Sequence, residues 1–462
     1  MRTKQLVEGL SDIVGREYVQ TQPEDLFLLE YDASLERGHP CAAVFPGSTE
    51  EVSLVMRLTH ELGIPVTPRG SGTNLSGGSI PVRGGVVLVT TRLSRILDID
   101  VGNRCALVEP GVFNLALQKA LIPLGYYYAP DPASQKVSTM GGNVGENSGG
   151  PHCLKYGVTM NHVLGVEVVI PNGEVSWIGG KAPDMPGYDL TGLLVGSEGT
   201  LGIVTKILVR IMAKPEAVRT LLVVFGNLGD AGRAVSAIIA AGIIPATLEM
   251  MDRTVIQAVE RATHAGLPQD VAALLIVEVD GLEDDLDRQV EDIVSICRRE
   301  GANEVKAAKN QTERDRLWAS RRGAFGALGQ LMPSYLVLDG TVPRTALPMA
   351  LEQVAEIGRL YGLQVGNVAH AGDGNLHPLF LFDPQELGII ERVRAAGLDI
   401  LKACAQLGGT ITGEHGIGTE KIRAMPLIFS QADLNAMRAV KHAFDSLNLL
   451  NPGKILPPVL GK

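Results

Sequence analysis

The sequence predicts an α+β protein whose two halves differ in texture. Up to about residue 215, short strands rich in valine and isoleucine are separated by glycine-rich turns, and long helical patterns are few. From about residue 216, strand-like runs alternate with longer helical patterns, as in "TLLVVFG" followed by "AGRAVSAIIAAG". This alternation indicates one sheet backed by helices, and 462 residues suffice for two or three domains of about 150 residues each.

Three further segments carry local signals of structure, two of them at the ends of the sequence. Residues 1–15 predict a short amphipathic helix and lack the apolar core of a signal peptide. Residues 42–56 predict a strand, a turn and a helix, because Ser48 or Thr49 can cap the helix and acidic residues follow. The final stretch, "NLLNPGKILPP", is too short to fold alone, so we expect it to return to one of the earlier sheets.

Composition excludes several classes of function. The 41 basic and 51 acidic residues give a net charge of -10 and are interspersed, which argues against a nucleic-acid partner. No apolar stretch approaches the roughly 20 residues that a transmembrane helix needs. The five cysteines are scattered and never form C-x-x-C, so neither a disulfide framework nor an iron–sulfur cluster is encoded. We therefore expect a cytoplasmic protein.

Three glycine-rich segments of the first half indicate phosphate binding. In "PRGSGTNLSGG", residues 68–78, small residues let backbone N–H groups converge into a nest for an anion. The segment lacks the lysine of a Walker loop and the helix of a dinucleotide fingerprint, and ordinary glycine turns are the alternative. With residues 131–157 and 196–207, which we read as further loops, it favours a ligand with two phosphates and an extended polar body.

A second motif of the other half suggests a metal site. "HAGDGNLHP" places His370 and His377 with six residues between them, and Glu414 follows in "TGEHGIGTEK". Two imidazoles and a carboxylate suit a divalent transition metal, whereas a hydrogen-bonded turn network is the alternative. The glycines on either side of Glu414 and His415 let both side chains serve one cleft. His415 is then the proton carrier, because imidazole changes charge near neutral pH.

A pair of arginines lies on a predicted helix in "WASRRGAF", residues 318–325. On a solvated face, Arg321 and Arg322 would only contribute solubility. If the cleft binds a carboxylate, one of them could clamp it with two parallel hydrogen bonds.

Taken together, these segments resemble the FAD-linked oxidases of the vanillyl-alcohol-oxidase fold. Within that family they are most similar to the flavoprotein subunit of bacterial glycolate oxidases and to D-lactate dehydrogenases. The resemblance runs from about residue 20 to residue 455. It is carried by the segments "PRGSGTNLSGG", "GGNVGENSGG", "GSEGTLGIVT", "HAGDGNLHP", "GEHGIG" and "NPGK".

The resemblance implies a domain plan. An N-terminal helical segment, 1–37, precedes an FAD-binding domain of the PCMH type, 38–215. An α/β ferredoxin-like cap domain follows at 216–405, and a C-terminal segment, 406–462, returns to the flavin with the metal and base motif. We expect the flavin and the metal ion to face one another where the two halves meet.

The family also implies which residues hold FAD. The loop from residue 68 to residue 78 grips the pyrophosphate, residues near 198–203 hold the adenosine part, and Asn451 approaches the isoalloxazine. That loop contains no histidine for a covalent link, so FAD is expected to be non-covalent. The implied cofactor-binding residues are Pro68, Arg69, Gly70, Ser71, Gly72, Thr73, Asn74, Gly77, Gly78, Pro132, Ser138, Gly141, Gly142, Asn147, Ser148, Gly149, Glu198, Gly202, Ile203 and Asn451.

By the same resemblance, the second half carries the chemistry. His370, His377 and Glu414 bind a divalent metal, for which zinc, manganese and iron all remain open. His415 acts as the catalytic base, and Arg321 binds the carboxylate of the substrate.

Three departures from the D-2-hydroxyglutarate dehydrogenases of this family bear on the substrate. Those enzymes carry a threonine, a lysine and an asparagine where this chain has Phe325, Val337 and Leu379. A second carboxylate in such an apolar pocket would cost several kcal/mol. We therefore expect a small 2-hydroxy acid, glycolate or D-lactate, oxidised to the 2-oxo acid.

Because the chain has no cluster motif, reduced flavin needs an outside electron acceptor unless oxygen reacts directly. The resemblance implies an electron-accepting partner, either an iron–sulfur subunit or an electron-transferring flavoprotein. Through such a partner the cytoplasmic protein could be peripheral to a membrane, and a homodimer stays open. The alternatives are a D-2-hydroxyglutarate-type dehydrogenase, a non-redox FAD transferase as in ether-lipid synthesis, and a silent FAD-binding subunit. A metal hydrolase is a further alternative, but it leaves the three phosphate-type loops unexplained.

Overall fold

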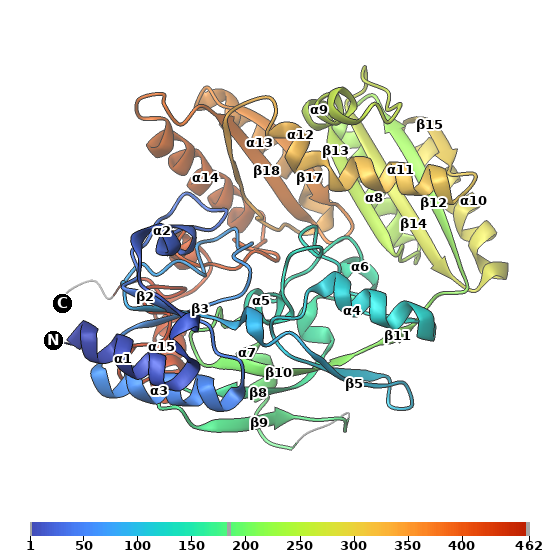
Figure 1. The fold of residues 1–462 in the computed structure, drawn as a ribbon. Coiled ribbons are helices and arrows are strands. Elements are labelled where there is room, and N and C mark those ends of the chain that lie inside the picture. The colour runs from blue at the N-terminus through green and yellow to red at the C-terminus, as the bar shows by residue number, and fades with distance from the viewer. Residues whose placement is uncertain (1, 183–185, 459–462) are drawn as a thin grey trace. The chain divides into compact units, whose positions relative to one another are not determined.

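The computed structural model describes residues 2–182 and 186–458, which divide into two compact units (Figure 1). Unit 1 takes the described residues up to Gly149, from Gly157 to Lys214 and from Glu414 onwards. Unit 2 takes Gly150–Tyr156 and Pro215–Gly413. The α+β class is confirmed, and the C-terminal segment belongs to the same unit as the glycine-rich half. The limits of the functional domains stay a prediction.

Unit 1 contains a small, mostly parallel sheet in which every strand but β1 runs the same way. Leu6 and Leu10 of α1 (Arg2–Val14) and Val52 of α3 (Thr49–Leu62) are buried in its core. The predicted cap of α3 is confirmed, because Ser48 accepts a hydrogen bond from the Glu51 N–H at 3.2 Å. The strand order is β1 (Val19–Gln20), β2 (Ala42–Val44), β4 (Val86–Val89) and β3 (Val66–Arg69).

A second sheet of unit 1 is antiparallel and has five strands. Its buried side chains pack with α4 (Asn114–Leu121), α7 (Leu190–Leu194) and α15 (Gln431–Phe444). The strand order is β5 (Ile96–Asp100), β6 (Cys105–Val108), β10 (Ile203–Arg210), β8 (Val163–Val169) and β9 (Val175–Gly179). Beside it lies a short ribbon of β7 (Tyr126–Tyr127) and β11 (Met212–Ala213).

One expected loop is partly helical. Within residues 131–157, which we read as a loop, α5 (Met140–Glu146) forms although it contains three glycines. Thr139 caps it by accepting a hydrogen bond from the Gly142 N–H at 3.3 Å, and Met140 and Val144 are buried. Capping and core burial therefore outweigh the poor helix propensity of glycine.

Unit 2 is built on one antiparallel sheet of seven strands, which confirms the predicted sheet backed by helices (Figure 1). One face packs against α9 (Arg253–Thr263), α11 (Gln311–Arg322) and α12 (Ala324–Leu328). The other face packs against α8 (Leu228–Ala240), α10 (Glu283–Arg299) and α13 (Leu347–Leu360), and α14 (Ile389–Gln406) lies beside α13. The strand order is β15 (Ala302–Ala307), β12 (Ala217–Phe225), β14 (Ala273–Gly281), β13 (Thr247–Asp252), β17 (Gln364–His370), β18 (Asn375–Phe382) and β16 (Ser334–Val337).

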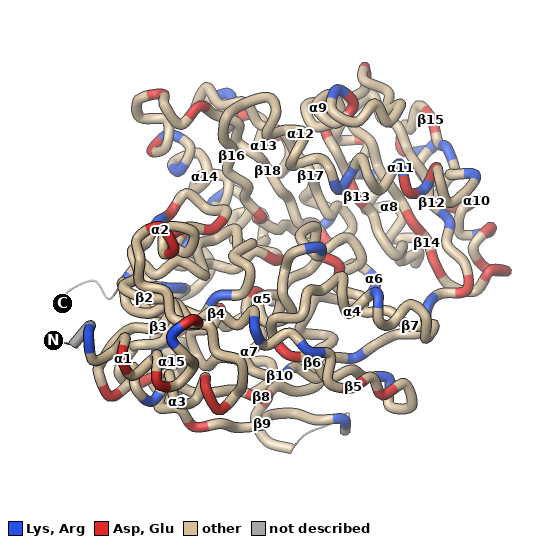
Figure 2. The backbone as a smooth tube through the Cα atoms, viewed as in Figure 1, with Lys and Arg blue, Asp and Glu red and all other residues tan. Residues whose placement is uncertain are grey.

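Lys and Arg alternate with Asp and Glu along the described part of the backbone (Figure 2). Within the described ranges, every helix is too short or too polar to cross a bilayer.

Candidate active site

The register of β17 and β18 brings the two predicted histidines together. His370 pairs with Asn375, and His377 pairs with Val368, which lies two residues from His370 on the same strand. Because side chains alternate along a strand, both imidazoles project from the same face of the sheet. Their ring centroids lie 4.9 Å apart.

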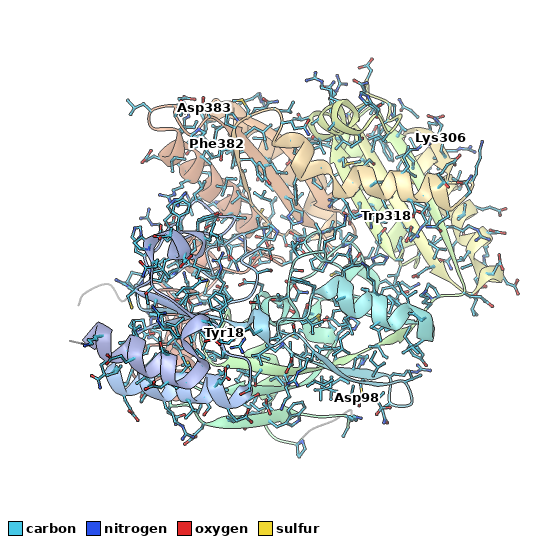
Figure 3. All side chains as sticks on the ribbon, in the orientation of Figure 1. Tyr18, Asp98, Lys306, Trp318, Phe382 and Asp383 are labelled. Atoms are coloured by element: carbon cyan, nitrogen blue, oxygen red, sulfur yellow. The ribbon has the colours of Figure 1, made fainter. Side chains whose placement is uncertain are left out.

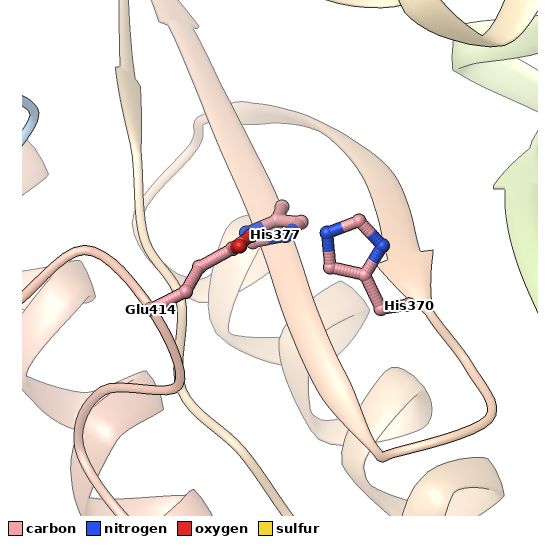
Figure 4. Close-up of side chains that lie close together, drawn as sticks. All are labelled: His370, His377 and Glu414. Carbon is pink, nitrogen blue, oxygen red and sulfur yellow. The ribbon is translucent and has the colours of Figure 1, made fainter. Parts of the chain in front are cut away.

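Glu414 completes the cluster that the sequence predicts. His370, His377 and Glu414 each offer one ligand atom, and these atoms lie within 4.8 Å of one another (Figure 4). The preceding residue, Gly413, donates its N–H to both the backbone and the side chain of Asp339, at 2.9 and 3.0 Å. A Cβ on Gly413 would lie 2.6 Å from the Asn375 side chain, so only glycine fits immediately before the carboxylate.

Hydrogen bonds set the tautomers of both imidazoles. Nδ1 of His370 lies 2.7 Å from Oε1 of Glu249, and Nδ1 of His377 lies 3.3 Å from the carbonyl oxygen of Leu338. A carbonyl and a carboxylate can only accept, so each Nδ1 carries a proton, and the nitrogen left to offer a lone pair to a metal ion is Nε2. Metal-binding histidines are commonly oriented in this way, so the donor set fits a divalent transition metal.

Glu249 is ionised in this arrangement. Burial alone would raise its pKa, but the neighbouring His370 and Arg321 outweigh burial, and the pKa of Glu249 is lowered. The side chain is therefore a carboxylate that accepts hydrogen bonds and compensates a buried positive charge.

Arg321 and Arg322, at the end of α11, differ in exposure. Arg322 is exposed, whereas Arg321 is only 4% exposed and places Nη2 at 2.5 Å from Oε2 of Glu249. Within the described ranges, Nη2 of Arg321 is thus taken up by the Glu249 carboxylate, whereas its Nε has no hydrogen-bond acceptor. Buried guanidinium donors of this kind suit a guest carboxylate.

The loop that carries His415 is anchored in unit 1. The carbonyl oxygen of His415 accepts a hydrogen bond from Ser76 at 2.9 Å. The N–H groups of Ile417 and Gly418 donate to the two carboxylate oxygens of Glu198, at 2.6 and 2.7 Å. The backbone on both sides of the predicted base is thus fixed by residues of the glycine-rich segments.

The predicted cofactor-binding residues all lie in unit 1, and several of their segments meet there. Asn451 donates Nδ2 to the carbonyl oxygens of Gly78 and Glu198, both at 2.8 Å. A Cβ on Gly70 would collide with Thr139, at the start of α5. Segments that are far apart in sequence therefore come together.

The loop at residues 70–78 fits a phosphate. Within the described ranges, the backbone N–H groups of Ser71, Gly72 and Thr73 donate no hydrogen bond. Gly72 has a φ of 76°, and Asn74 accepts from the N–H groups of Ser76 and Gly78, at 2.8 and 2.9 Å, which closes the loop. Successive unpaired amides on a tight bend form an anion-binding nest.

Three of the predicted cofactor residues have unusual backbone conformations. Asn147, Glu198 and Asn451 adopt φ values of 54°, 51° and 43°, in the left-handed region that residues other than glycine rarely occupy. Such conformations cluster at ligand sites. The remaining predicted residues lie at the end of β3, in the segment around α5 and at the start of β10.

Sequence reasoning missed three charged residues of these sites. Glu146 is held by Asn74, and Lys454 donates Nζ to the carbonyl oxygens of Gly77 and Ile80, both at 2.6 Å. Burial raises the pKa of Glu146, and it lowers the pKa of Lys454 to about 8. Glu249 was the third, and its only signal was a single acidic residue within the apolar run "TLEMM".

Two family models match the chain. Residues 40–179 match the FAD binding domain, and residues 214–455 match the C-terminal domain of FAD linked oxidases. The nest in unit 1 and the cluster on β17 and β18 thus lie in a flavin-dependent oxidoreductase. The chain belongs to the FAD-linked oxidase family.

Two relatives and one solved structure are similar to this chain over most of its length. The glycolate oxidase subunit GlcD of Escherichia coli is 46% identical over 457 residues, which cover 99% of this chain and 91% of that protein. A D-lactate dehydrogenase of Archaeoglobus fulgidus is 33% identical, covering 89% of this chain and 90% of its own. The solved structure of p-cresol methylhydroxylase matches with a TM-score of 0.85 at 19% identity, covering 100% of this chain and 98% of that one, and shows the same fold.

Proposed function

We propose that the protein oxidises a small 2-hydroxy acid, glycolate or D-lactate, to the corresponding 2-oxo acid and passes the electrons to a partner protein. The names of the relatives support this substrate class. The observation that carries the proposal is the His370, His377 and Glu414 cluster, whose ligand atoms lie within 4.8 Å of one another. Arg321, a buried cation, shares Glu249 with one of these ligands.

The reaction removes two electrons and two hydrogens from the substrate. Bound FAD supplies the acceptor for the electron pair that leaves C2 with its hydrogen, and a divalent ion at the cluster supplies a Lewis acid that lowers the pKa of the substrate hydroxyl. Arg321 binds the carboxylate and fixes the orientation of C2. His415, the residue after Glu414, takes the hydroxyl proton, so that the C–O single bond becomes the carbonyl of the product.

An apolar wall beside the cluster supports a small substrate. Val337 and Leu379 are cross-strand partners on β16 and β18, and both are buried. The ring of Phe325 meets the ring of His377 edge-on, with centroids 6.3 Å apart. A second carboxylate placed against these side chains would lose its hydration without gaining a partner, which disfavours D-2-hydroxyglutarate.

The electrons must then leave the protein, because the chain carries no C-x-x-C motif for a cluster of its own. The relative from Escherichia coli is named as a subunit, which supports transfer to another chain, either an iron–sulfur subunit or an electron-transferring flavoprotein. The proposed location is cytoplasmic, with membrane association through that partner.

The experiment is an anaerobic titration of the purified protein with glycolate, D-lactate, L-lactate and D-2-hydroxyglutarate, followed through the flavin absorption band. The expected result is bleaching by glycolate or D-lactate at far lower concentration than by D-2-hydroxyglutarate. A yellow protein that none of these acids bleaches would contradict the proposal and would favour a non-redox transferase of the same fold.

A further inference from the structure

We infer that Glu249 is a positioning residue that holds the metal ligand His370 and the carboxylate-binding Arg321 in one fixed arrangement. The inference rests on the proposed function for the roles of those two residues. It adds a residue that contacts neither the ion nor the substrate and that acts through both of its neighbours.

The first argument is the strand register. Glu249 on β13 is the direct cross-strand partner of His370 on β17. Both side chains therefore project from the same face of the sheet, beside His377. Strand pairing in a packed sheet defines this juxtaposition, so it does not depend on a mobile loop.

The second argument is that the two carboxylate oxygens of Glu249 contact different residues. Oε1 accepts the Nδ1 proton of His370 at 2.7 Å, while Oε2 lies 2.5 Å from Nη2 of Arg321. One oxygen fixes which ring nitrogen presents its lone pair, and the other fixes one edge of the guanidinium. A single rigid group thus sets the spacing between the ligand of the ion and the anchor of the substrate.

The third argument is burial. Glu249 is 1% exposed, Arg321 is 4% exposed and His370 is 8% exposed, so water cannot readily replace any of these contacts. An unpaired charge in such a place is costly, and loss of the carboxylate would leave the guanidinium uncompensated. Removal of Glu249 is therefore expected to disturb both of its partners together.

The test compares Glu249→Gln and Glu249→Ala with a matched control, Glu278→Gln. Glu278 is also 1% exposed in its side chain, lies on the same sheet and pairs with another arginine of α11, but it touches no residue of the cluster. Each full-length, FAD-loaded variant is depleted of metal and titrated with Zn²⁺ and Mn²⁺ in competition with a chelator. KM and kcat for glycolate or D-lactate are then measured at saturating metal.

We expect Glu249→Ala to weaken metal binding by about 10- to 100-fold, as for other residues that orient a metal ligand. Glu249→Gln retains one acceptor for His370 but turns an amide N–H₂ toward Arg321, so its loss should appear mainly as a raised KM with a smaller change in kcat. The control should bind metal as the wild type does. The isosteric Gln variant answers the question even if the Ala variant does not fold.

Unchanged metal affinity and KM in both Glu249 variants would overturn the inference, and so would an equal loss in the Glu278 control. A wild-type protein that takes up no divalent ion would also overturn it, even if glycolate bleaches the flavin. The metal titration contains no substrate, so a failed bleaching experiment would refute the proposed function without deciding the role of Glu249.

Discussion

Two buried glutamates on one sheet of unit 2 have similar neighbours in the sequence and different contacts in the structure. Glu249 lies in "TLEMM" on β13, and Glu278 lies in "LLIVEVD" on β14. Each pairs with an arginine of α11, and these two arginines, Arg314 and Arg321, are seven residues apart, about two helical turns. A buried glutamate that pairs with an arginine of α11 therefore occurs at two positions along this helix.

The Glu278 site and the Glu249 site differ in how many of their hydrogen-bond donors have an acceptor. Glu278 accepts from Thr220 at 2.6 Å, from both Nε and Nη2 of Arg314 at 2.8 Å, and from Trp318 at 2.8 Å. Of these residues, Figure 3 labels Trp318. At the other site, Nη2 of Arg321 pairs with Glu249, but Nε of Arg321 has no acceptor within the described ranges. A saturated network stabilises a fold, whereas buried donors without acceptors mark a place for a ligand.

The largest effect is expected at His415, the residue that follows Glu414 in the sequence. Changing His415 to Gln removes the proposed proton acceptor while preserving much of the side-chain size. Anaerobic flavin reduction by glycolate or D-lactate should slow by about 10²- to 10⁴-fold. Stopped-flow absorbance measures this rate, and the exposed His442 changed to Gln is the control. A near-normal rate in the His415 variant would assign the base elsewhere.

A smaller effect, on stability alone, is expected at the Glu278 site, where side-chain donors around the carboxylate are hydrogen-bonded to it. Arg314→Ala leaves Glu278 buried without its cation, and unfolding free energy should fall by about 2 kcal/mol, less than for a fully buried pair because Arg314 is partly exposed. Chemical denaturation measures the loss, and metal affinity should be unchanged. A weakened metal site in this variant would mean that the two glutamates are not independent.

A change in substrate preference of about 10-fold is expected from two substitutions in the apolar wall. Phe325→Thr combined with Val337→Lys places polar groups where the apolar wall stands, and kcat/KM for D-2-hydroxyglutarate should rise about 10-fold relative to that for glycolate. Steady-state assays of both acids give the ratio. The same ratio in variant and wild type would show that these side chains do not line the pocket.

The smallest effect concerns pH. Burial is the main cause that raises the pKa of Glu198, to about 7, well above the usual glutamate value near 4.5. The folded protein then binds this proton more tightly than the unfolded chain, so the stabilising contribution is complete below about pH 4.5 and is lost as pH rises through 7.

Glu198→Gln should therefore flatten the fall in thermal midpoint between pH 5 and 7 by a few degrees. Scanning calorimetry across that range measures the slope, with the exposed Glu304 changed to Gln as control. Equal slopes in wild type and Glu198→Gln would show that Glu198 does not take up a proton there.

These residues also show which features of the fold and of the candidate site could be predicted from the sequence. The cluster of His370, His377 and Glu414 was predictable because imidazole and carboxylate groups on glycine-punctuated segments are chemically distinctive. The α3 cap was predictable because Ser48 precedes a helical pattern with acidic residues. Both features are local or depend on residue type.

Glu249 was not predictable in this way. Its sequence context resembles that of Glu278, and only the pairing of β13 with β17 places Glu249, and not Glu278, beside His370. Helix α5 was missed for a related reason. Its three glycines predict a loop, and the burial of Met140 and Val144 that stabilises the helix depends on tertiary packing. Register and packing are non-local, so the chain does not display them in any short segment.

The most direct test of the account is anaerobic flavin reduction by glycolate or D-lactate before metal depletion, after it, and after Zn²⁺ or Mn²⁺ is restored. We predict a loss of at least about 100-fold in rate on depletion, because Lewis-acid activation supplies several kcal/mol, and recovery when the ion returns. An equally fast reduction in fully metal-free protein would contradict the assignment of His370, His377 and Glu414 as the centre of the reaction.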